Sequence, residues 1–175
     1  MVKAVTEKKA DMIYTDEDQI SVDGKQHYEP KFKPDFNLYR LRENNYIGRF
    51  WAVRKEIMEQ SGWFNPQYDG AENFDMLLRC SEQAAQIVHI PRVLCHNMDA
   101  GQQLSQEEKQ KAGEAGRKAL EEHYHRVQIP AAVEQTEKPG WYRSHLAIQG
   151  EPLVSIIIPS KDHINDLDLC VTSIE

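Results

Sequence analysis

The chain has 175 residues, 40% of them hydrophobic, and a formal net charge of −7 because 28 acidic residues outnumber 21 basic ones. This length accommodates one modest core with an appendage and excludes two complete enzyme domains. The acidic balance, with no run of lysine or arginine, argues against a surface that neutralises many phosphates. We therefore expect no nucleic acid partner.

No apolar stretch approaches the roughly 18 residues needed to cross a bilayer, and the longest, at residues 153–158, is interrupted by Ser155. The first nine residues lack the apolar core of a signal peptide. The three cysteines lie far apart, which favours neither a disulfide framework nor a zinc knuckle. These features predict a cytoplasmic protein, with peripheral attachment to the inner face of the membrane as a further option.

The first predicted strand covers residues 10–14 and is followed by an acidic cluster. Its largely apolar sequence is typical of a buried strand. Asp16, Glu17 and Asp18 would then lie at the carboxyl edge of that strand. This is the edge at which open α/β sheets bind ligands.

A β-hairpin is predicted next, because Asp23 and Gly24 tolerate the positive φ angles of a tight turn and lie between two strand-like segments. Pro30 and Pro34 indicate an extended, irregular path beyond the hairpin. Residues 46–53 are rich in aromatic and β-branched side chains and predict another strand.

Two helices and a strand follow. Residues 54–61 predict a helix that stops at Gly62. From Ala71 onward the apolar residues recur at helical spacing, with charged residues on the other face. Residues 86–90 predict a strand that Pro91 halts, although the chain stays extended to His96.

The last third of the chain changes character twice. Ser105 and Glu108 form a capping box that starts a separate, mostly solvated helix reaching residue 127. Residues 128–150 indicate a linker that docks through Trp141 and Tyr142. Residues 153–158 then predict a buried strand, followed by a helical pattern, so a new βα unit begins there. We divide the chain into residues 1–104, 105–150 and 151–175 accordingly.

Three groups of residues could carry chemistry. Asp16 and Asp18 are close enough in sequence to suit a hard divalent metal, although an acidic turn before a hairpin is equally common. Glu72 and Asp75 open a helix, where the helix dipole and an ion pair with Arg79 explain them without a catalytic role. His96 follows a strand, where a structural histidine is more frequent than a metal ligand.

The order of these residues resembles the family 2 glycosyltransferases, in particular the bacterial tandem-domain members that build cell-surface polysaccharides. The matching segments, in order, are Tyr14-Thr-Asp-Glu-Asp18, Phe32-Lys-Pro-Asp-Phe36, Asn45-Tyr-Ile-Gly48, Gly62 with Phe64, Gly70 to Asp75 with Leu78-Arg79, and His89-Ile-Pro-Arg-Val-Leu-Cys-His96. Val154-Ser-Ile-Ile-Ile-Pro159 resembles the first strand of the family's catalytic domain, yet it lies downstream of the acidic motif. The resemblance therefore implies the back half of one nucleotide-diphosphosugar transferase domain, with a mixed sheet and an accessory helix, and the start of a second domain.

The resemblance also implies the chemistry. Asp16 and Asp18 would bind Mn²⁺ or Mg²⁺, with His96 as a further ligand. Asp16 and Glu17 would be the cofactor-binding residues. The donor would be a nucleotide-diphosphosugar and the acceptor a glycan or a lipid-linked molecule. The family places an aspartate base where this chain has Asn73, so either Glu72 or Asp75 would replace it or this domain would be impaired.

Two further expectations follow from the incomplete domain. The 175-residue chain should not turn over donor by itself. Its unpaired strand at residues 153–158 should pair with an orphaned sheet edge of residues 1–100 or with another copy of the chain. The rival hypothesis is a non-catalytic glycan-binding or scaffolding module derived from the same fold.

Overall fold

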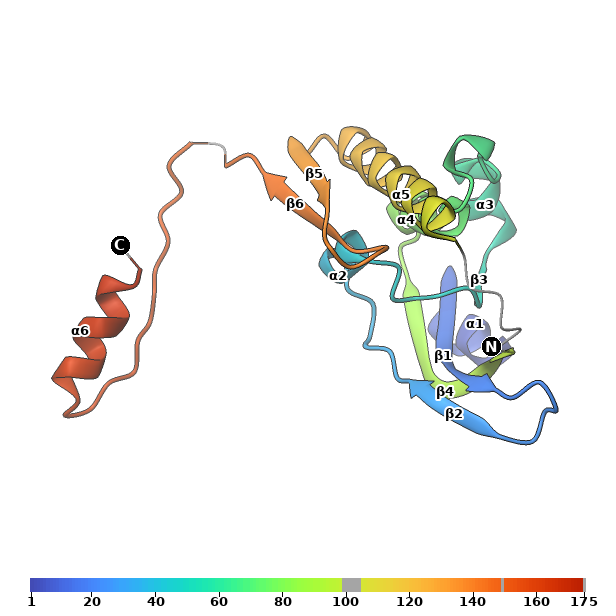
Figure 1. The fold of residues 1–175 in the computed structure, drawn as a ribbon, viewed down its shortest axis with the longest axis horizontal. Coiled ribbons are helices and arrows are strands. Elements are labelled where there is room, and N and C mark those ends of the chain that lie inside the picture. The colour runs from blue at the N-terminus through green and yellow to red at the C-terminus, as the bar shows by residue number, and fades with distance from the viewer. Residues whose placement is uncertain (99–104, 149, 175) are drawn as a thin grey trace.

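The computed structural model describes residues 1–98, 105–148 and 150–174. Its helices and strands form an α/β fold (Figure 1). In chain order the elements are α1 (Val2–Lys8), β1 (Met12–Ile20), β2 (His27–Lys31), α2 (Leu38–Glu43), β3 (Trp51–Val53), α3 (Lys55–Ser61), the 3-10 turn Pro66–Tyr68, α4 (Glu72–Gln83), β4 (Ile87–Met98), α5 (Gln106–Arg126), β5 (Ala131–Gln135), β6 (Tyr142–Leu146) and α6 (Ile164–Thr172). None of the described helices is long and apolar enough to cross a membrane.

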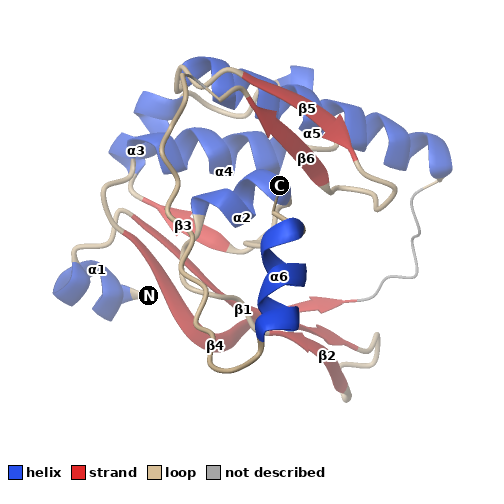
Figure 2. Cartoon of the chain, turned by 90° about the vertical axis from the view of Figure 1, so that its left-hand side faces the viewer, coloured by secondary structure: helices blue, strands red, loops and turns tan. Residues whose placement is uncertain are grey.

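β1 is the strand to which the other three strands of the larger sheet pair (Figure 2). β4 runs parallel to it, from Met12 opposite Ile87 to Ile20 opposite Met98. On its other side, β3 pairs antiparallel with the first residues of β1 and β2 pairs antiparallel with the last. The predicted α/β class and mixed sheet are confirmed, but the first strand is longer than predicted, so the acidic cluster lies within the strand rather than after it.

The predicted β-hairpin is present, with Ile20 opposite His27 and a positive φ of 71° at Gly24. The prediction of an irregular path is wrong at Pro30, which lies inside β2, and is confirmed at residues 32–34, which form no regular element. Two residues of β2, Glu29 and Pro30, lie opposite a single residue of β1, Asp18. This is a β-bulge, and a bulge on an outer strand accommodates a residue without a backbone N–H.

Pro91 does not halt β4 either, because the register shifts there as well. Thr15 lies opposite Ile90 while the next residue of β1, Asp16, lies opposite Val93. The two extra residues of β4 bulge outward, so the strand continues to Met98. Bulges in both neighbouring strands therefore lie beside the acidic residues of β1.

The predicted strand at residues 46–53 forms only at its end, as β3. Gly48 has a φ of +81°, which lies outside the extended region and interrupts the strand. α2 was not predicted. It is capped at its N-terminus by Asn37, whose side chain accepts a hydrogen bond from the Arg40 N–H at 3.0 Å. α3 and α4 are confirmed, and α3 ends at Gly62 as predicted.

α5 packs against α4 and contributes to the main core, so the prediction of a separate helix is wrong, although most residues of the helix are not buried, as predicted. Ala119, Leu120 and Tyr124 are buried. They join side chains of β1, α2, α4, β5 and β6, including Met12, Tyr14, Leu41, Met76, Leu77, Leu78, Val133 and Tyr142. The opposite face of the sheet is covered by α1, whose Ala4 packs in a small cluster with Ala10, Ile13 and Val88.

Residues 131–146 form a two-stranded antiparallel sheet, so the predicted linker is wrong over this span. The prediction that Tyr142 docks is confirmed. Its ring stacks on Phe74 of α4 with centroids 5.6 Å apart, and its hydroxyl donates to the Gly113 carbonyl of α5 at 3.2 Å. Burial raises the pKa of Tyr142 to about 12, so it stays a neutral donor.

Residues 153–158 form no strand in the described structure, and Leu153 and Ile157 are almost fully exposed. α6 follows, with no buried residue. Both lie apart from the rest of the fold (Figure 1). The predicted pairing of this segment with a sheet edge of the same chain is therefore wrong, whereas its pairing with a second copy stays a prediction.

An ion-pair network ties α2, α4 and α5 together. The Arg42 Nε–H donates to His123 Nε2 at 3.1 Å, and His123 Nδ1 lies 2.7 Å from Glu82. Arg126 also donates to Glu82. Burial would raise the pKa of Glu82, but hydrogen bonds from His123 and Arg126 outweigh it and hold that pKa below its ordinary value of 4.5.

Acid should therefore destabilise the fold partly through Glu82. A carboxylate with a lowered folded-state pKa contributes stability above its unfolded pKa and loses it as pH falls through the folded value. We expect the free energy of unfolding to fall more steeply between about pH 5 and about pH 3 in the wild type than in Glu82→Gln. Urea titrations across this range measure the difference, and parallel curves for the two proteins would contradict the prediction.

Gly116 of α5 should be essential for docking of Tyr142. A Cβ at this position would lie 2.0 Å from the Tyr142 hydroxyl oxygen. Gly116→Ala should lower the free energy of unfolding by about 1–3 kcal/mol through overpacking, although alanine alone would favour the helix by about 1 kcal/mol.

Gly113→Ala is the matched control on the same helix. Its Cβ would meet the end of the flexible Gln135 side chain, which can move aside. Chemical denaturation should show no loss of stability for this variant. Equal destabilisation by the two substitutions would disprove the role given to Tyr142.

Candidate functional site

Three consecutive carboxylates of β1 are buried, and each one has different partners. Asp16, Glu17 and Asp18 are between 2% and 8% exposed. Buried carboxylates are stable only when hydrogen bonds or opposite charges replace the water that they lose. The neighbouring strands and the chain after β2 supply these partners.

Asp16 is held in the interior of the sheet. Its Oδ1 lies 2.8 Å from His89 Nε2 and accepts the backbone N–H of Lys33 at 2.9 Å. The ring of Tyr14 stacks on His89 with centroids 4.9 Å apart, and its hydroxyl donates to the Pro34 carbonyl at 2.6 Å. Asp16 was expected to bind the metal and the cofactor, but its carboxylate contacts His89, a buried histidine that was not predicted as a site residue.

Glu17, expected on the cofactor side, pairs with two lysines. The buried Lys33 Nζ lies 3.1 Å from its Oε2, and Lys31 Nζ lies 3.7 Å from its Oε1. Lys33 Nζ also donates to the Ile47 carbonyl at 2.6 Å. A Cβ on Gly48 would lie 2.7 Å from Glu17 Oε2, so the loop after α2 is packed directly against this ion pair.

Asp18 faces two histidines. Its Oδ1 lies 2.5 Å from His96 Nδ1, and its Oδ2 lies 2.9 Å from His27 Nδ1. Burial alone would raise the pKa of Asp18, but the two imidazoles hold that pKa below its ordinary value. The structure thus brings together the expected residues Asp18 and His96 and adds His27, while Asp16 lies with His89.

His27 could have been found from the sequence. A hairpin closed around Asp23 and Gly24 places the residues just after the turn beside those just before it, and His27 pairs with Ile20 in the structure. The ligand atoms of Asp18, His27 and His96 all lie within 4.8 Å of one another. A carboxylate with two imidazoles is a donor set that fits a divalent cation.

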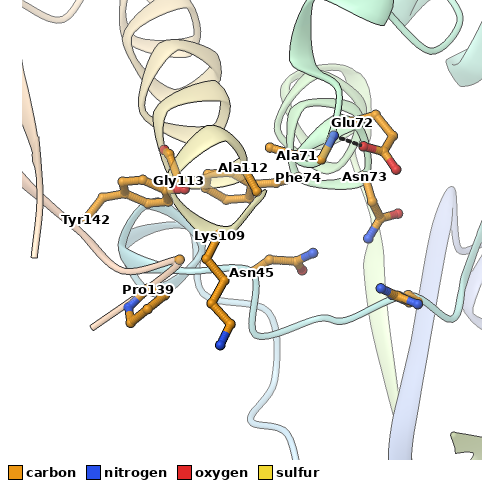
Figure 3. Close-up of a pocket in the computed structure, with 13 residues that line it drawn as sticks. Asn45, Ala71, Glu72, Asn73, Phe74, Lys109, Ala112, Gly113, Pro139 and Tyr142 are labelled. Carbon is orange, nitrogen blue, oxygen red and sulfur yellow. Dashed lines mark hydrogen bonds between the residues drawn. The ribbon is translucent and has the colours of Figure 1, made fainter. Parts of the chain in front are cut away.

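The start of α4 forms a second part of the candidate site. A cavity of about 300 Å³ lies between it, the loop at Asn45, the start of α5 and the turn at Pro139 (Figure 3). Glu72 lines this cavity and its Oε2 accepts the Gly70 N–H at 2.8 Å. Lys109 reaches across the same space (Figure 3).

The two candidate bases differ in environment. Asp75 is fully buried, and its Oδ2 binds Arg79 at 2.6 and 3.0 Å. Arg79 in turn donates to the carbonyls of Gly62 and Trp63, so this pair fastens α4 to the end of α3. The arrangement favours a structural role for Asp75, whereas Glu72 is open to the cavity.

Asn73 joins the two parts of the site. Its Oδ1 accepts the Trp51 indole N–H at 2.8 Å, and its Nδ2 donates to the Gly48 carbonyl at 2.7 Å. Gly48 in turn contacts Glu17. The amide therefore connects the acidic strand β1, the strand β3 and the start of α4.

Asn73→Asp should destabilise the fold, because a carboxylate cannot donate to the Gly48 carbonyl. We expect a loss of about 1 kcal/mol in the free energy of unfolding, the usual contribution of one hydrogen bond. Asn97→Asp on β4 is a matched control, since the Asn97 amide oxygen accepts only a long hydrogen bond, from the Cys95 thiol at 3.9 Å, within the described residues. Urea denaturation that ranks the two variants equally would refute the connecting role of Asn73.

No protein-family model matches the chain. It is 41% identical over 172 residues to the uncharacterized protein y4gI of Sinorhizobium fredii (strain NBRC 101917 / NGR234). It is 35% identical over 165 residues to the O-antigen biosynthesis protein RfbC of Myxococcus xanthus. These matches cover 94% and 93% of this chain but only 19% and 13% of the two relatives. The chain therefore spans less than a fifth of the length of the curated relatives it matches.

Proposed function

We propose that the chain is part of a glycosyltransferase that acts in the synthesis of a cell-surface polysaccharide. The observation that carries this proposal is the similarity of almost the whole chain to a protein named for O-antigen biosynthesis. The acidic strand and the cavity at the start of α4 support it, because they offer separate places for a charged donor and for an acceptor. The donor would be a nucleotide-diphosphosugar and the acceptor a glycan or a lipid-linked molecule.

Asp18 and His96 would hold Mn²⁺ or Mg²⁺, and the bound ion would offset the negative charge of the departing diphosphate. The other residues have roles that need no ion. Asp16 and Glu17 fix the acidic strand through His89 and Lys33. Glu72 lies at the cavity, where its carboxylate would accept the proton of the acceptor hydroxyl.

The test is release of nucleoside diphosphate from a panel of nucleotide sugars, measured for this chain and for the longest protein that contains it. We expect turnover only in the longer protein and a loss of at least about 100-fold in Glu72→Gln, the usual contribution of a general base. Glu107→Gln, on an exposed residue of α5, is the control. Turnover that survives Glu72→Gln would remove Glu72 as the base.

One observation favours a second candidate, a non-catalytic glycan-binding module. Asn73 stands where the resembling family has its base, and both ends of its amide are engaged in hydrogen bonds within the fold. The same panel separates the two candidates. Glycan binding without turnover by the longer protein would support the module and contradict the transferase.

A further inference from the structure

His27 supplies a third side chain to the metal group of Asp18 and His96, and it does so from a different strand. Asp18 is on β1, His96 is on β4 and His27 begins β2. The two histidines therefore approach the carboxylate from its two sides. Their rings meet edge to face, with centroids 4.6 Å apart.

The group is open on one side. The side chain of Asp18 is 10% exposed, whereas those of His27 and His96 are 47% and 44% exposed. A cation held by these three side chains would thus keep positions open toward solvent for an exogenous ligand. Catalytic zinc sites typically have three protein ligands and such an open position.

The strands on both sides of Asp18 contain β-bulges. Glu29 and Pro30 bulge opposite Asp18, and Glu29 has a φ of 48°, which is uncommon for a residue other than glycine. Beside it, β4 carries extra residues before it brings His96 opposite Asp18. Bulges of this kind re-aim side chains next to functional sites.

The nearby cations do not compete for Asp18. Lys31 and Lys33 both pair with Glu17, whereas the Asp18 carboxylate contacts the two histidines. Imidazole nitrogens are themselves metal ligands, whereas a lysine ammonium has only N–H donors and cannot bind a cation. The group is therefore compatible with cation binding in a way that the lysine-paired Glu17 is not.

We propose that Asp18, His27 and His96 form a two-histidine, one-carboxylate site that selects transition-metal ions such as Co²⁺ and Mn²⁺ over Mg²⁺. Imidazole suits first-row transition metals, whereas Mg²⁺ prefers oxygen ligands and near-ideal octahedral geometry. This inference deepens the proposed function, since it names the class of metal at the same site. The imidazole of His27 would be the ligand that makes the site prefer transition-metal ions over Mg²⁺.

The experiment titrates CoCl₂, MnCl₂ and MgCl₂ separately into the untagged chain. Calorimetry follows all three ions, and visible absorption follows Co²⁺. We expect Co²⁺ to bind at least about tenfold more tightly than Mg²⁺. His27→Ala should lower the Co²⁺ affinity by about tenfold or more, equivalent to about 1.4 kcal/mol, and leave Mg²⁺ binding within about twofold.

His145→Ala is the matched control, because His145 is an exposed histidine on β6 that also lies beside a carboxylate, that of Glu134. It should leave Co²⁺ binding unchanged. Circular dichroism checks that both variants fold. In the wild type, Zn²⁺ should shift the imidazole ¹⁵N resonances of His27 and His96 but not those of His145.

The proposal is overturned if the wild type binds Co²⁺ no more tightly than Mg²⁺, if His27→Ala binds Co²⁺ like the wild type, or if the His27 resonances do not respond to Zn²⁺. None of these measurements depends on sugar transfer. Failure of the proposed function would therefore appear in the donor assay alone, and failure of this inference would appear in the metal titrations alone.

Discussion

The burial of three consecutive carboxylates on the central strand is the constraint on which the rest of the structure depends. Ionised groups in a protein interior require paired charges or hydrogen bonds, or they destabilise the fold by several kcal/mol. β1 meets this requirement with partners from three places: His89 and His96 on β4, His27 on β2, and the two lysines at and after the end of β2. The hairpin and the parallel strand are thus held in register by polar contacts as well as by backbone pairing.

The same constraint reaches the start of α4. Lys33 binds both Glu17 and the carbonyl of Ile47, so the loop after α2 is fixed against β1. The next residue, Gly48, fits beside Glu17 only because it lacks a side chain, and its carbonyl accepts a hydrogen bond from Asn73. A change in the position of the acidic strand would therefore also move the residues that line the cavity beside Glu72. The two parts thus form one candidate site.

The region after β4 completes the fold. α5 covers α4 (Figure 1). Tyr142 of the β5–β6 sheet stacks on Phe74 of α4 and donates a hydrogen bond to the Gly113 carbonyl of α5. The network of Arg42, His123 and Glu82 adds polar contacts between α2, α5 and α4. Residues 131–146 therefore form part of the packed structure, in contrast to the exposed residues 153–158.

The sequence by itself determined the local elements whose signals are short in range. The turn at Gly24, the end of α3 at Gly62, the capping box of α5 and the stripe of α4 each follow from a few neighbouring residues, and the structure contains them. Asp18 and His96 were also recognisable as a pair, through a resemblance rather than through geometry.

Long-range packing decided the rest. The bulges at Pro30 and Pro91 let strands pass residues that would otherwise end them, and they decide that Asp16 meets His89 while Asp18 meets His27. Side chains on one strand look equivalent in sequence, but their partners depend on the register of other strands, and that register is fixed only when the whole sheet has formed.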